Sequence, residues 1–338
     1  MTKPSAIESS PNKRRFTNVD QLRGLLIVLV MLGHIVLGSV HDNVIRYSIY
    51  AFHMPVFIAL TGYLINAESL KKQSFLSVFS RYWWRVILPF GFAYAFYTGI
   101  LSYHAYQEGR ITLKLLMSYA HTPYYHLWFI PTLVLWVLGF AAALKLRLPF
   151  IFLLISCVLL SIIWAAVPKA DLGGFLAPFL SKKVIYFFSF FLFGAWLKMP
   201  SSKRFRKLLA DFRVLPIAIA LFCALPYLFN IGADKTLLKS FAWLILNLSL
   251  ISVLIQYAVS AVQSKPSIIS EIGRNSLPIY LWHMLPLFIL KGFDIHQSHT
   301  LVYYLLGSLG MLLIVWGILK LESRNKFIDR CLFGINNA

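Results

Sequence analysis

Long apolar segments alternate with short polar segments along almost the whole chain. A segment of about 20 apolar residues can cross the hydrocarbon core of a bilayer as an α-helix. The pattern predicts ten such spans, at residues 21–40, 45–66, 83–103, 124–144, 149–167, 183–199, 213–231, 238–262, 276–293 and 300–321. The expected fold class is therefore all-α: a polytopic membrane protein with about ten transmembrane helices.

The polar segments between the predicted spans are short. They leave no room for an added soluble domain, so we expect a single membrane domain over residues 18–322. The basic residues 1–17 are expected to form a flexible N-terminal tail, and residues 323–338 a cytoplasmic C-terminal tail.

The positive charges predict the orientation of the spans. An even number of spans places both termini on the same side of the membrane. If that side is the cytoplasm, most of the 32 lysines and arginines also fall on the cytoplasmic side, as the positive-inside rule expects. We therefore predict that both termini are cytoplasmic.

The composition agrees with a membrane location. Hydrophobic residues make up 59% of the chain and charged residues only 13%, whereas soluble domains carry about 25% charged residues. The net charge of +20 is explained by loop cations that face anionic lipids, so we expect lipid contact and no nucleic-acid partner. The three cysteines, Cys157, Cys223 and Cys331, lie far apart in the sequence, which predicts neither a disulfide framework nor a metal site.

The first predicted span carries Arg23 near its start and His34 eleven residues later. Polar side chains are unfavourable in a bilayer and often functional there. Eleven residues place the two on one helical face, about 16 Å apart along the axis. His53, in the second span, is expected at the same depth as His34, which suggests a polar pocket in the outer half of the membrane. An imidazole there can act as a general base; the alternative is an interhelical hydrogen bond that serves packing.

Four arginines are expected at the cytoplasmic ends of spans: Arg23, Arg81, Arg85 and Arg274. A ring of guanidinium groups suits a phosphate-rich ligand, because each group can form bidentate charge-assisted hydrogen bonds. The alternative for any one of them is anchoring at the lipid interface. Arg23 and Arg85 are the stronger candidates, since each lies in the first turn of a span.

Two further groups of polar residues flank the later spans. Ser276, Tyr280 and His283 share one face of the ninth span, with His283 expected nearer the inner half. Pocket lining and packing both remain open for this face. At the outer end of the fourth span, Tyr124 and Trp128 are typical of an aromatic belt, but such belts do not need His126.

Several features of other protein classes are missing. The twelve acidic residues all fall at span ends or in loops, whereas ion-coupled carriers generally place a carboxylate within the membrane. The sequence also contains no phosphate-binding glycine loop and no serine-hydrolase elbow.

Five short motifs, in this order along the chain, resemble acyltransferase family 3, the integral membrane O-acyltransferases that include polysaccharide O-acetylases and O-succinylases. They are Asp20-x-Leu-Arg23-Gly with Gly33-His34, Phe52-His53-Met54-Pro55-x-Phe57 with Gly62-Tyr63-Leu64, Arg85-x-x-x-Pro89, His126-Leu-Trp-Phe, and Ile272-Gly-Arg-Asn-Ser276 with Tyr280 and His283. One departure is Thr61, where the family usually has serine; threonine keeps the hydroxyl group.

The resemblance implies acyl transfer from a cytoplasmic acyl-CoA, usually acetyl-CoA, to a hydroxyl of a glycan at the outer face. His34 is then the catalytic base, with His53 in support, and Arg23 orients the donor. The other donor-binding residues are Arg81, Arg85, Arg274, Asn275 and Ser276, and the acceptor side comprises His126, Trp128, Tyr280 and His283.

The same resemblance suggests the partners and the location. We expect acyl-CoA as a donor substrate with no tightly bound cofactor, a cell-surface or lipid-linked glycan as acceptor, and the bacterial plasma (inner) membrane as the location. A homo-oligomer is compatible with the sequence. Succinyl or longer donors, a lipid or small-molecule acceptor, and a covalent acyl-enzyme all stay open.

Two other function classes are weighed against the enzyme. An exporter of a glycan or lipid-linked glycan could use the histidines to line its path, but intramembrane carboxylates and an internal repeat are missing. A structural membrane subunit would have no need for polar residues on several spans.

Overall fold

In a computed structural model, residues 17–39, 43–121, 125–166, 182–209, 237–292, 300–321, 327 and 329–334 are described, and every regular element in them is helical. The first half of the chain contains α1 (Thr17–Ile35), α2 (Val44–Leu64), α3 (Ala67–Lys72), α4 (Phe75–Tyr82), the π-helix η1 (Trp83–Ile87), α5 (Leu88–Gln107), α6 (Leu113–His121), the 3-10 helix η2 (Tyr125–Trp128), α7 (Phe129–Lys145) and α8 (Phe150–Ala166). The second half contains α9 (Lys182–Leu197), the 3-10 helix η3 (Pro200–Ser202), α10 (Lys203–Leu209), α12 (Leu237–Ser260), α13 (Ile268–Arg274), α14 (Ser276–Trp282), α15 (Leu285–Gly292), α17 (Thr300–Leu321) and the π-helix η4 (Asp329–Phe333). The all-α prediction is confirmed.

Among the described residues, six helical segments are long and apolar enough to cross a membrane: Thr17–Ile35, Val44–Leu64, Phe75–Gln107, His126–Lys145, Trp243–Ser260 and Thr300–Leu321. A seventh counts if Val184–Leu197 and Pro200–Lys207, which meet at a bend of 91°, form one span. The predicted spans 149–167 and 276–293 correspond to shorter apolar helices. The predicted span 213–231, the tail 1–16 and Tyr124 lie outside the described residues. Ten spans and cytoplasmic termini therefore stay predictions.

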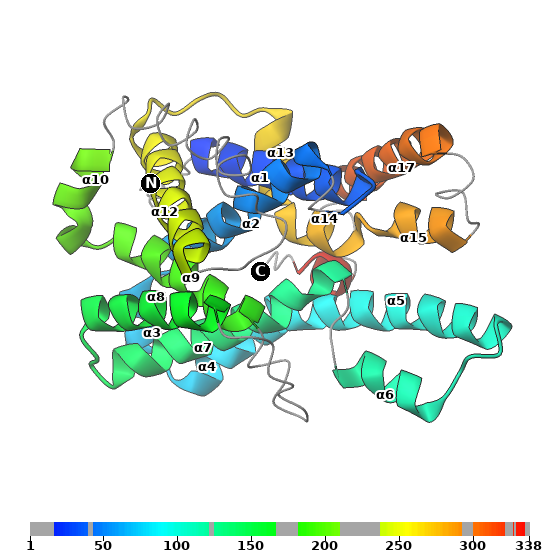
Figure 1. Ribbon diagram of the computed structural model, residues 1–338, viewed down its shortest axis with the longest axis horizontal. Coiled ribbons are helices and arrows are strands. Elements are labelled where there is room, and N and C mark those ends of the chain that lie inside the picture. The colour runs from blue at the N-terminus through cyan, green and yellow to red at the C-terminus, as the bar shows by residue number, and fades with distance from the viewer. Residues whose placement is uncertain are drawn as a thin grey trace, which may run out of the picture.

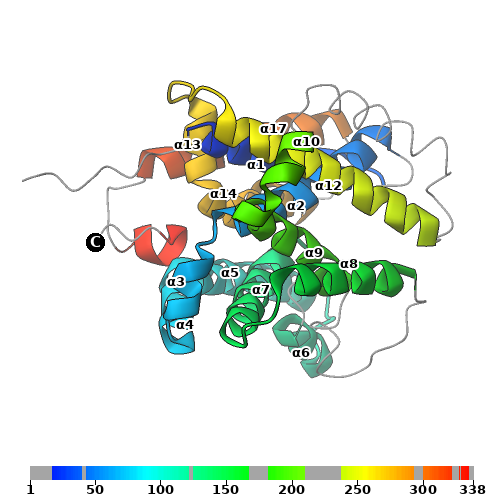
Figure 2. The same ribbon diagram turned by 90° about the vertical axis from the view of Figure 1, so that its left-hand side faces the viewer.

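The helices form two groups with a middle layer between them. Figure 1 and Figure 2 both show α3 to α8 in one group and α1, α12, α13 and α17 in the other. The helices α2, α9 and α14 lie between these groups in both views. The two most extensive helix pairs are α1 with α13 and α2 with α9.

Glycine allows α1 and α13 to pack backbone against backbone. A Cβ atom at Gly24 would meet the carbonyl oxygen of Ile269, and one at Gly273 would meet that of Asp20. Small residues permit such close helix contacts in membranes, where association depends on packing and hydrogen bonds rather than on hydrophobic burial. The start of α1, including Arg23, is thereby held against the end of α13.

Prolines explain the breaks in the later helices. Pro278 and Pro286 lie in the first turns of α14 and α15, the positions that tolerate a residue without an N–H group. The chain has turns at Asn275 and at His283 and Met284, although Ser276–Lys291 still forms one apolar helix. Pro89 acts similarly on the long helix from α4 to α5, because it cannot donate to the carbonyl of Arg85, and the π-helix η1 precedes it.

The described part of the C-terminal segment is packed, which differs from the expected tail. Asp329, Cys331 and Phe333 of η4 are buried, and η4 contacts η1, α5 and α14. The indole N–H of Trp282 donates to the carbonyl of Leu332 at 3.4 Å. Apolar residues and a glycine allow this short segment to pack against the helices. Its position near the end of the chain suggested a tail instead.

The close packing of α2 and α9 gives a first prediction. A Cβ atom at Gly194 would meet the carbonyl oxygen of Ala59 and lie 2.8 Å from its Cα. We expect Gly194→Ala to destabilise the protein by about 1–3 kcal/mol, the usual cost of overpacking, and to lower the Tm measured in detergent.

Gly139→Ala in α7 is the matched control, since nothing lies within 4 Å of a Cβ atom there. Alanine is about 1 kcal/mol better than glycine within a helix, so this variant should keep or raise the Tm. Equal Tm values for the two variants would contradict the backbone contact between α2 and α9.

Candidate active site

A cavity of about 1010 Å³ is lined by all four arginines singled out in the sequence: Arg23, Arg81, Arg85 and Arg274. We call it the arginine cavity. Its described lining also includes polar groups and a side chain from the C-terminal segment, namely Thr61, Asn66, Tyr82, Asn275, Ser276 and Phe333. Its volume lies at the upper end of the range for small-molecule sites, about 300–1000 Å³.

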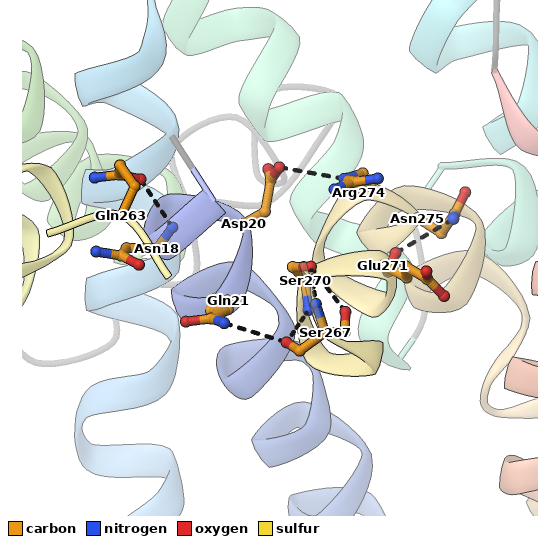
Figure 3. A network of polar contacts seen from close by, with 9 residues as sticks. All are labelled: Asn18, Asp20, Gln21, Gln263, Ser267, Ser270, Glu271, Arg274 and Asn275. Atoms are coloured by element: carbon orange, nitrogen blue, oxygen red, sulfur yellow. Dashed lines mark hydrogen bonds and ion pairs between the residues drawn. The ribbon is translucent and has the colours of Figure 1, made fainter. Parts of the chain in front are cut away.

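A polar network at the junction of α1 and α13 positions one side of the arginine cavity (Figure 3). The Arg274 Nε lies 3.5 Å from Oδ2 of Asp20, which forms an ion pair between the two helices. Gln21 donates to the hydroxyl of Ser267, and Ser267 and Ser270 form a capping box at the start of α13. The Asn275 side chain donates to the Glu271 carbonyl at 3.3 Å. These contacts bring Arg274 and Asn275 to the same cavity as Arg23.

A second cavity, of about 280 Å³, is lined by His34, His53 and His126. We call it the histidine cavity. The other residues that line it are Val30, Leu37, Arg46, Tyr50, Met54, Trp128, Tyr280, Met284, Lys291 and Tyr303. Arg23 and His34 therefore reach two different cavities from one helix, about 16 Å apart along its axis.

His283 joins this cluster, which corrects the depth expected from the sequence. Its ring centroid lies 5.4 Å from that of His34 and 4.9 Å from that of His126. The sequence placed it nearer the inner half, by counting residues from the expected cytoplasmic end of the span 276–293. Contacts between helices, which that count does not include, bring its ring beside those of His34 and His126.

The histidines differ in how their rings are held. Nδ1 of His53 bonds to the Ile49 carbonyl at 2.6 Å, and Nδ1 of His283 to the Tyr280 carbonyl at 2.9 Å. Nε2 of His126 bonds to the Leu281 carbonyl at 3.3 Å. A carbonyl oxygen only accepts hydrogen bonds, so these three ring nitrogens each carry a proton.

His34 lacks such an anchor. In the part of the chain that the structure describes, its only hydrogen-bond partner is the hydroxyl of Tyr50, 3.5 Å from Nδ1. A hydroxyl can both donate and accept, so His34 can take up or release a proton without breaking a bond to the backbone. The other three rings are fixed in one tautomer by their carbonyl partners.

A wall of aromatic rings separates the two cavities. Tyr280 lines both cavities, and its hydroxyl donates to the carbonyl of His126. Phe129 lies beside Tyr280 and beside Phe57, with both centroid distances 5.7 Å. Phe57 and Phe129 line the arginine cavity. A ligand that extends from one cavity to the other must pass these rings.

The structure brings together all the residues proposed from the sequence, in two groups. Every donor-side residue lines the arginine cavity. Of the acceptor-side residues, His126, Trp128 and Tyr280 line the histidine cavity, and His283 contacts its rings. Trp128 also stacks on Phe187 at 5.6 Å, within the protein.

Sequence reasoning missed Arg46, Lys291 and Tyr50 in the histidine cavity and Phe333 and Gly334 in the arginine cavity. Arg46 and Lys291 had a usable signal, because the predicted topology puts both on the outer side, where the positive-inside rule does not call for cations. Phe333 and Gly334 had none, since they lie near the end of the chain.

These features define a class: an all-helical membrane protein with a cationic cavity and a histidine cavity linked by one helix. Within that class, the chain belongs to the acyltransferase family, whose acyltransferase-domain model matches residues 16–320. The protein is therefore a membrane acyltransferase by family.

Two relatives are similar over a short stretch. The nodulation protein NolL of Sinorhizobium fredii (strain NBRC 101917 / NGR234) is 36% identical over 69 residues, which are 18% of this chain and 19% of the relative. NolL of Mesorhizobium japonicum (strain LMG 29417 / CECT 9101 / MAFF 303099) is 35% identical over 66 residues, 18% of each chain. The chain thus matches less than a fifth of the length of these curated relatives. No solved structure matches it.

The C-terminal wall of the arginine cavity gives a second prediction. Gly334 has φ +66°, and a Cβ atom there would meet the carbonyl oxygen of Arg85. We expect Gly334→Ala to detach residues 329–334, because both the backbone conformation and the contact disfavour a side chain. Limited trypsin digestion followed by mass spectrometry should then show faster cleavage after Arg330.

Gly109→Ala provides the control for backbone strain alone. Gly109 also has a positive φ, +64°, but nothing lies within 4 Å of its Cβ position. Cleavage after Arg330 should stay at the wild-type rate in this variant. Slow cleavage in Gly334→Ala would count against the packing of the segment on Arg85.

Proposed function

We propose that the protein is a membrane O-acyltransferase that moves an acyl group, most simply acetyl, from cytoplasmic acyl-CoA to a hydroxyl of an extracytoplasmic glycan. The observation that carries this proposal is the pair of cavities at the two ends of α1, with Tyr280 lining both. A donor with a charged head and a long thin arm fits this arrangement, because the acyl group can reach one cavity while the head stays in the other.

The arginine cavity suits the phosphates of CoA. Coenzyme A carries a pyrophosphate and a 3′-phosphate, and guanidinium groups bind phosphates through bidentate, charge-assisted hydrogen bonds. Four arginines line the cavity, and Asn275 and Ser276 add polar groups beside Arg274. In this proposal Arg85 holds phosphate. Arg23, which lies on the same helix as His34, orients the donor.

The pantetheine arm would cross the aromatic wall. Its extended length is comparable to the roughly 16 Å between Arg23 and His34 along α1. Phe57, Phe129 and Tyr280 would have to move aside or admit the arm between their rings, and their apolar surfaces would exclude water from the thioester. The same rings argue against a glycan exporter, which needs a path wide enough for a sugar chain.

His34 is the proposed general base. It takes the proton of the acceptor hydroxyl while the hydroxyl oxygen attacks the thioester carbonyl. The new ester O–C bond forms, the C–S bond breaks, and the thiolate of CoA takes the proton from His34 as it leaves. His34 is the member of the cluster that no described backbone carbonyl holds. It can therefore carry the proton from the acceptor hydroxyl oxygen to the thiolate sulfur of CoA.

The neighbouring histidines support the acceptor. With their protonated nitrogens bonded to carbonyls, His126 and His283 each present one acceptor nitrogen, and neither of these has a partner among the described residues. Hydroxyls of a sugar can donate to such nitrogens. His53 contacts Tyr50 with a centroid distance of 5.2 Å and so supports the ring that bonds to His34.

The proposal requires the arginine cavity to open toward the cytoplasm, where acyl-CoA is found. Ten spans with both termini in the cytoplasm would give this orientation, and the positive-inside rule supports it. A bacterial plasma membrane is the location that matches a glycan acceptor outside the cell.

The role of His34 gives a third prediction. His34→Ala should lower acetyl transfer to the native glycan about 10²–10⁴-fold, the usual contribution of a general base. Transfer is measured with labelled acetyl-CoA in membranes that contain the variant. Binding of labelled acetyl-CoA should persist, because the arginine cavity is unchanged.

His104→Ala is the control, since His104 lies in the last turn of α5 and lines neither cavity. It should transfer acetyl groups as the wild type does. Wild-type turnover by His34→Ala would contradict the proposed mechanism.

The role of Arg85 gives a fourth prediction. Arg85→Lys keeps the positive charge but loses bidentate contact with phosphate. We expect the KM for acetyl-CoA to rise about tenfold, which corresponds to roughly 1.4 kcal/mol of lost interaction, with a smaller change in kcat. Steady-state kinetics of the purified protein measure both.

Arg204→Lys, at an exposed position of α10, is the matched control and should leave the KM unchanged. An unchanged KM for Arg85→Lys would show that Arg85 does not bind the donor.

A further inference from the structure

Two cations line the histidine cavity that the proposed reaction does not use. Arg46 comes from the first turn of α2 and Lys291 from the last turn of α15. None of the described residues that line this cavity is acidic. Both cations line the same cavity as His34. The described lining of the cavity is therefore positively charged as well as rich in imidazoles.

Among the described residues, backbone carbonyls and an aromatic ring hold Arg46 in place. Its Nη1 donates to the carbonyls of Val36 and Gly38, at 2.8 and 2.7 Å. Its guanidinium carbon lies 5.3 Å above the centroid of the Tyr50 ring. These contacts fix the plane of the guanidinium group beside the tyrosine that bonds to His34.

One polar atom of Arg46 has no partner within the described residues. Its Nε is buried and makes no hydrogen bond there. A buried polar donor such as this Nε is normally satisfied by a hydrogen-bond partner. An oriented cation with a spare donor in a cavity is suited to bind an anion.

Membrane orientation does not explain these two residues. Under the predicted topology, Arg46 and Lys291 lie on the outer side, whereas the positive-inside rule places cations in the cytoplasm. Base catalysis by His34 does not require them either, since the proton leaves with the thiolate of CoA.

We propose that the acceptor carries an anionic group, a carboxylate or a phosphate, which Arg46 and Lys291 bind while His34 takes the proton of a nearby hydroxyl. This inference rests on the proposed acyltransferase function and specifies its acceptor. The cavity of about 280 Å³ is small for a ligand site, so it admits one sugar-sized group at a time. The anion and the reacting hydroxyl must then belong to the same or adjacent sugar units.

Two sources could supply the anion. A sugar acid in the glycan carries a carboxylate, and a lipid-linked glycan carries phosphate next to its first sugar. A planar guanidinium forms paired hydrogen bonds with either group. The cavity therefore suits both anions, and an experiment is needed to separate the two sources.

The test uses the purified full-length protein in detergent, labelled acetyl-CoA, and de-O-acetylated glycan from the cells that make the protein. The glycan is offered in three forms: untreated, with its carboxylates reduced to alcohols, and with its phosphates removed. Acetylation of the original hydroxyl is measured for each form as kcat/KM.

We expect kcat/KM to fall at least about tenfold when the anion is removed, the loss that corresponds to one charge-assisted contact. A fall on carboxylate reduction identifies a sugar acid, and a fall on dephosphorylation identifies a phosphate. Equal kcat/KM for all three forms would overturn this inference and leave the proposed function standing. No transfer to any form would overturn the proposed function, and this inference with it.

Substitutions connect the preference to the two cations. Arg46→Gln should bring the ratio of kcat/KM for untreated glycan over anion-free glycan close to one, and Lys291→Gln should lower it as well. Lys291 is exposed, so its variant keeps the test open if Arg46→Gln fails to fold. Arg110→Gln, an exposed arginine paired with Glu108, should keep the wild-type ratio.

The variants also test the alternative that the cations only stabilise charge on the reacting atoms. In that case Arg46→Gln would lower kcat/KM equally for the anionic and the anion-free glycan, and the ratio would stay at its wild-type value. That result would overturn the proposal of an anionic acceptor.

Discussion

The contact between α1 and α13 is the constraint on which both cavities depend. Gly24 and Gly273 let the two backbones touch, and the ion pair of Asp20 with Arg274 fixes their register. Because α13 runs on into α14, the same contact that brings Arg274 beside Arg23 also leads His283 to His34. In a bilayer, where hydrophobic burial gives little preference for one helix pair over another, such close packing and polar contacts decide which helices meet.

The helix breaks have a second role, since they place backbone carbonyls where side chains need partners. Near the break between α14 and α15, the carbonyl of Leu281 accepts from both His126 and Tyr97. The π-helix η1 presents Arg85 to the arginine cavity while Gly334 packs at its carbonyl. The carbonyls of Leu281, Tyr280 and Ile49 hold His126, His283 and His53. Among the described residues, His34 has only the hydroxyl of Tyr50 as a hydrogen-bond partner. The distinction between anchored rings and one ring free to exchange its proton is a property of the backbone around them.

Much of the fold and the site could be predicted from local patterns. The hydrophobic segments give the helices, and the spacing of Arg23 and His34 gives two ends of one face. Counting residues from the end of a span does not show how far neighbouring helices are shifted along one another, so His283 was expected nearer the inner half than its position beside His34. Nor does hydropathy distinguish a tail from the packed segment 329–334, because a few apolar residues are too short to carry a periodic pattern.

The sequence by itself determined the all-helical class, the family motifs and the types of residue available for chemistry. These depend on composition and on spacing within single helices, which the chain carries locally. Only the tertiary structure decided which residues share a cavity, that Arg46 and Lys291 join the histidines, and that His34 alone of the cluster lacks a described carbonyl partner. Those facts come from contacts between helices far apart in the chain, and in a membrane the difference between lipid-facing and buried apolar surfaces is too small for the sequence pattern to reveal them.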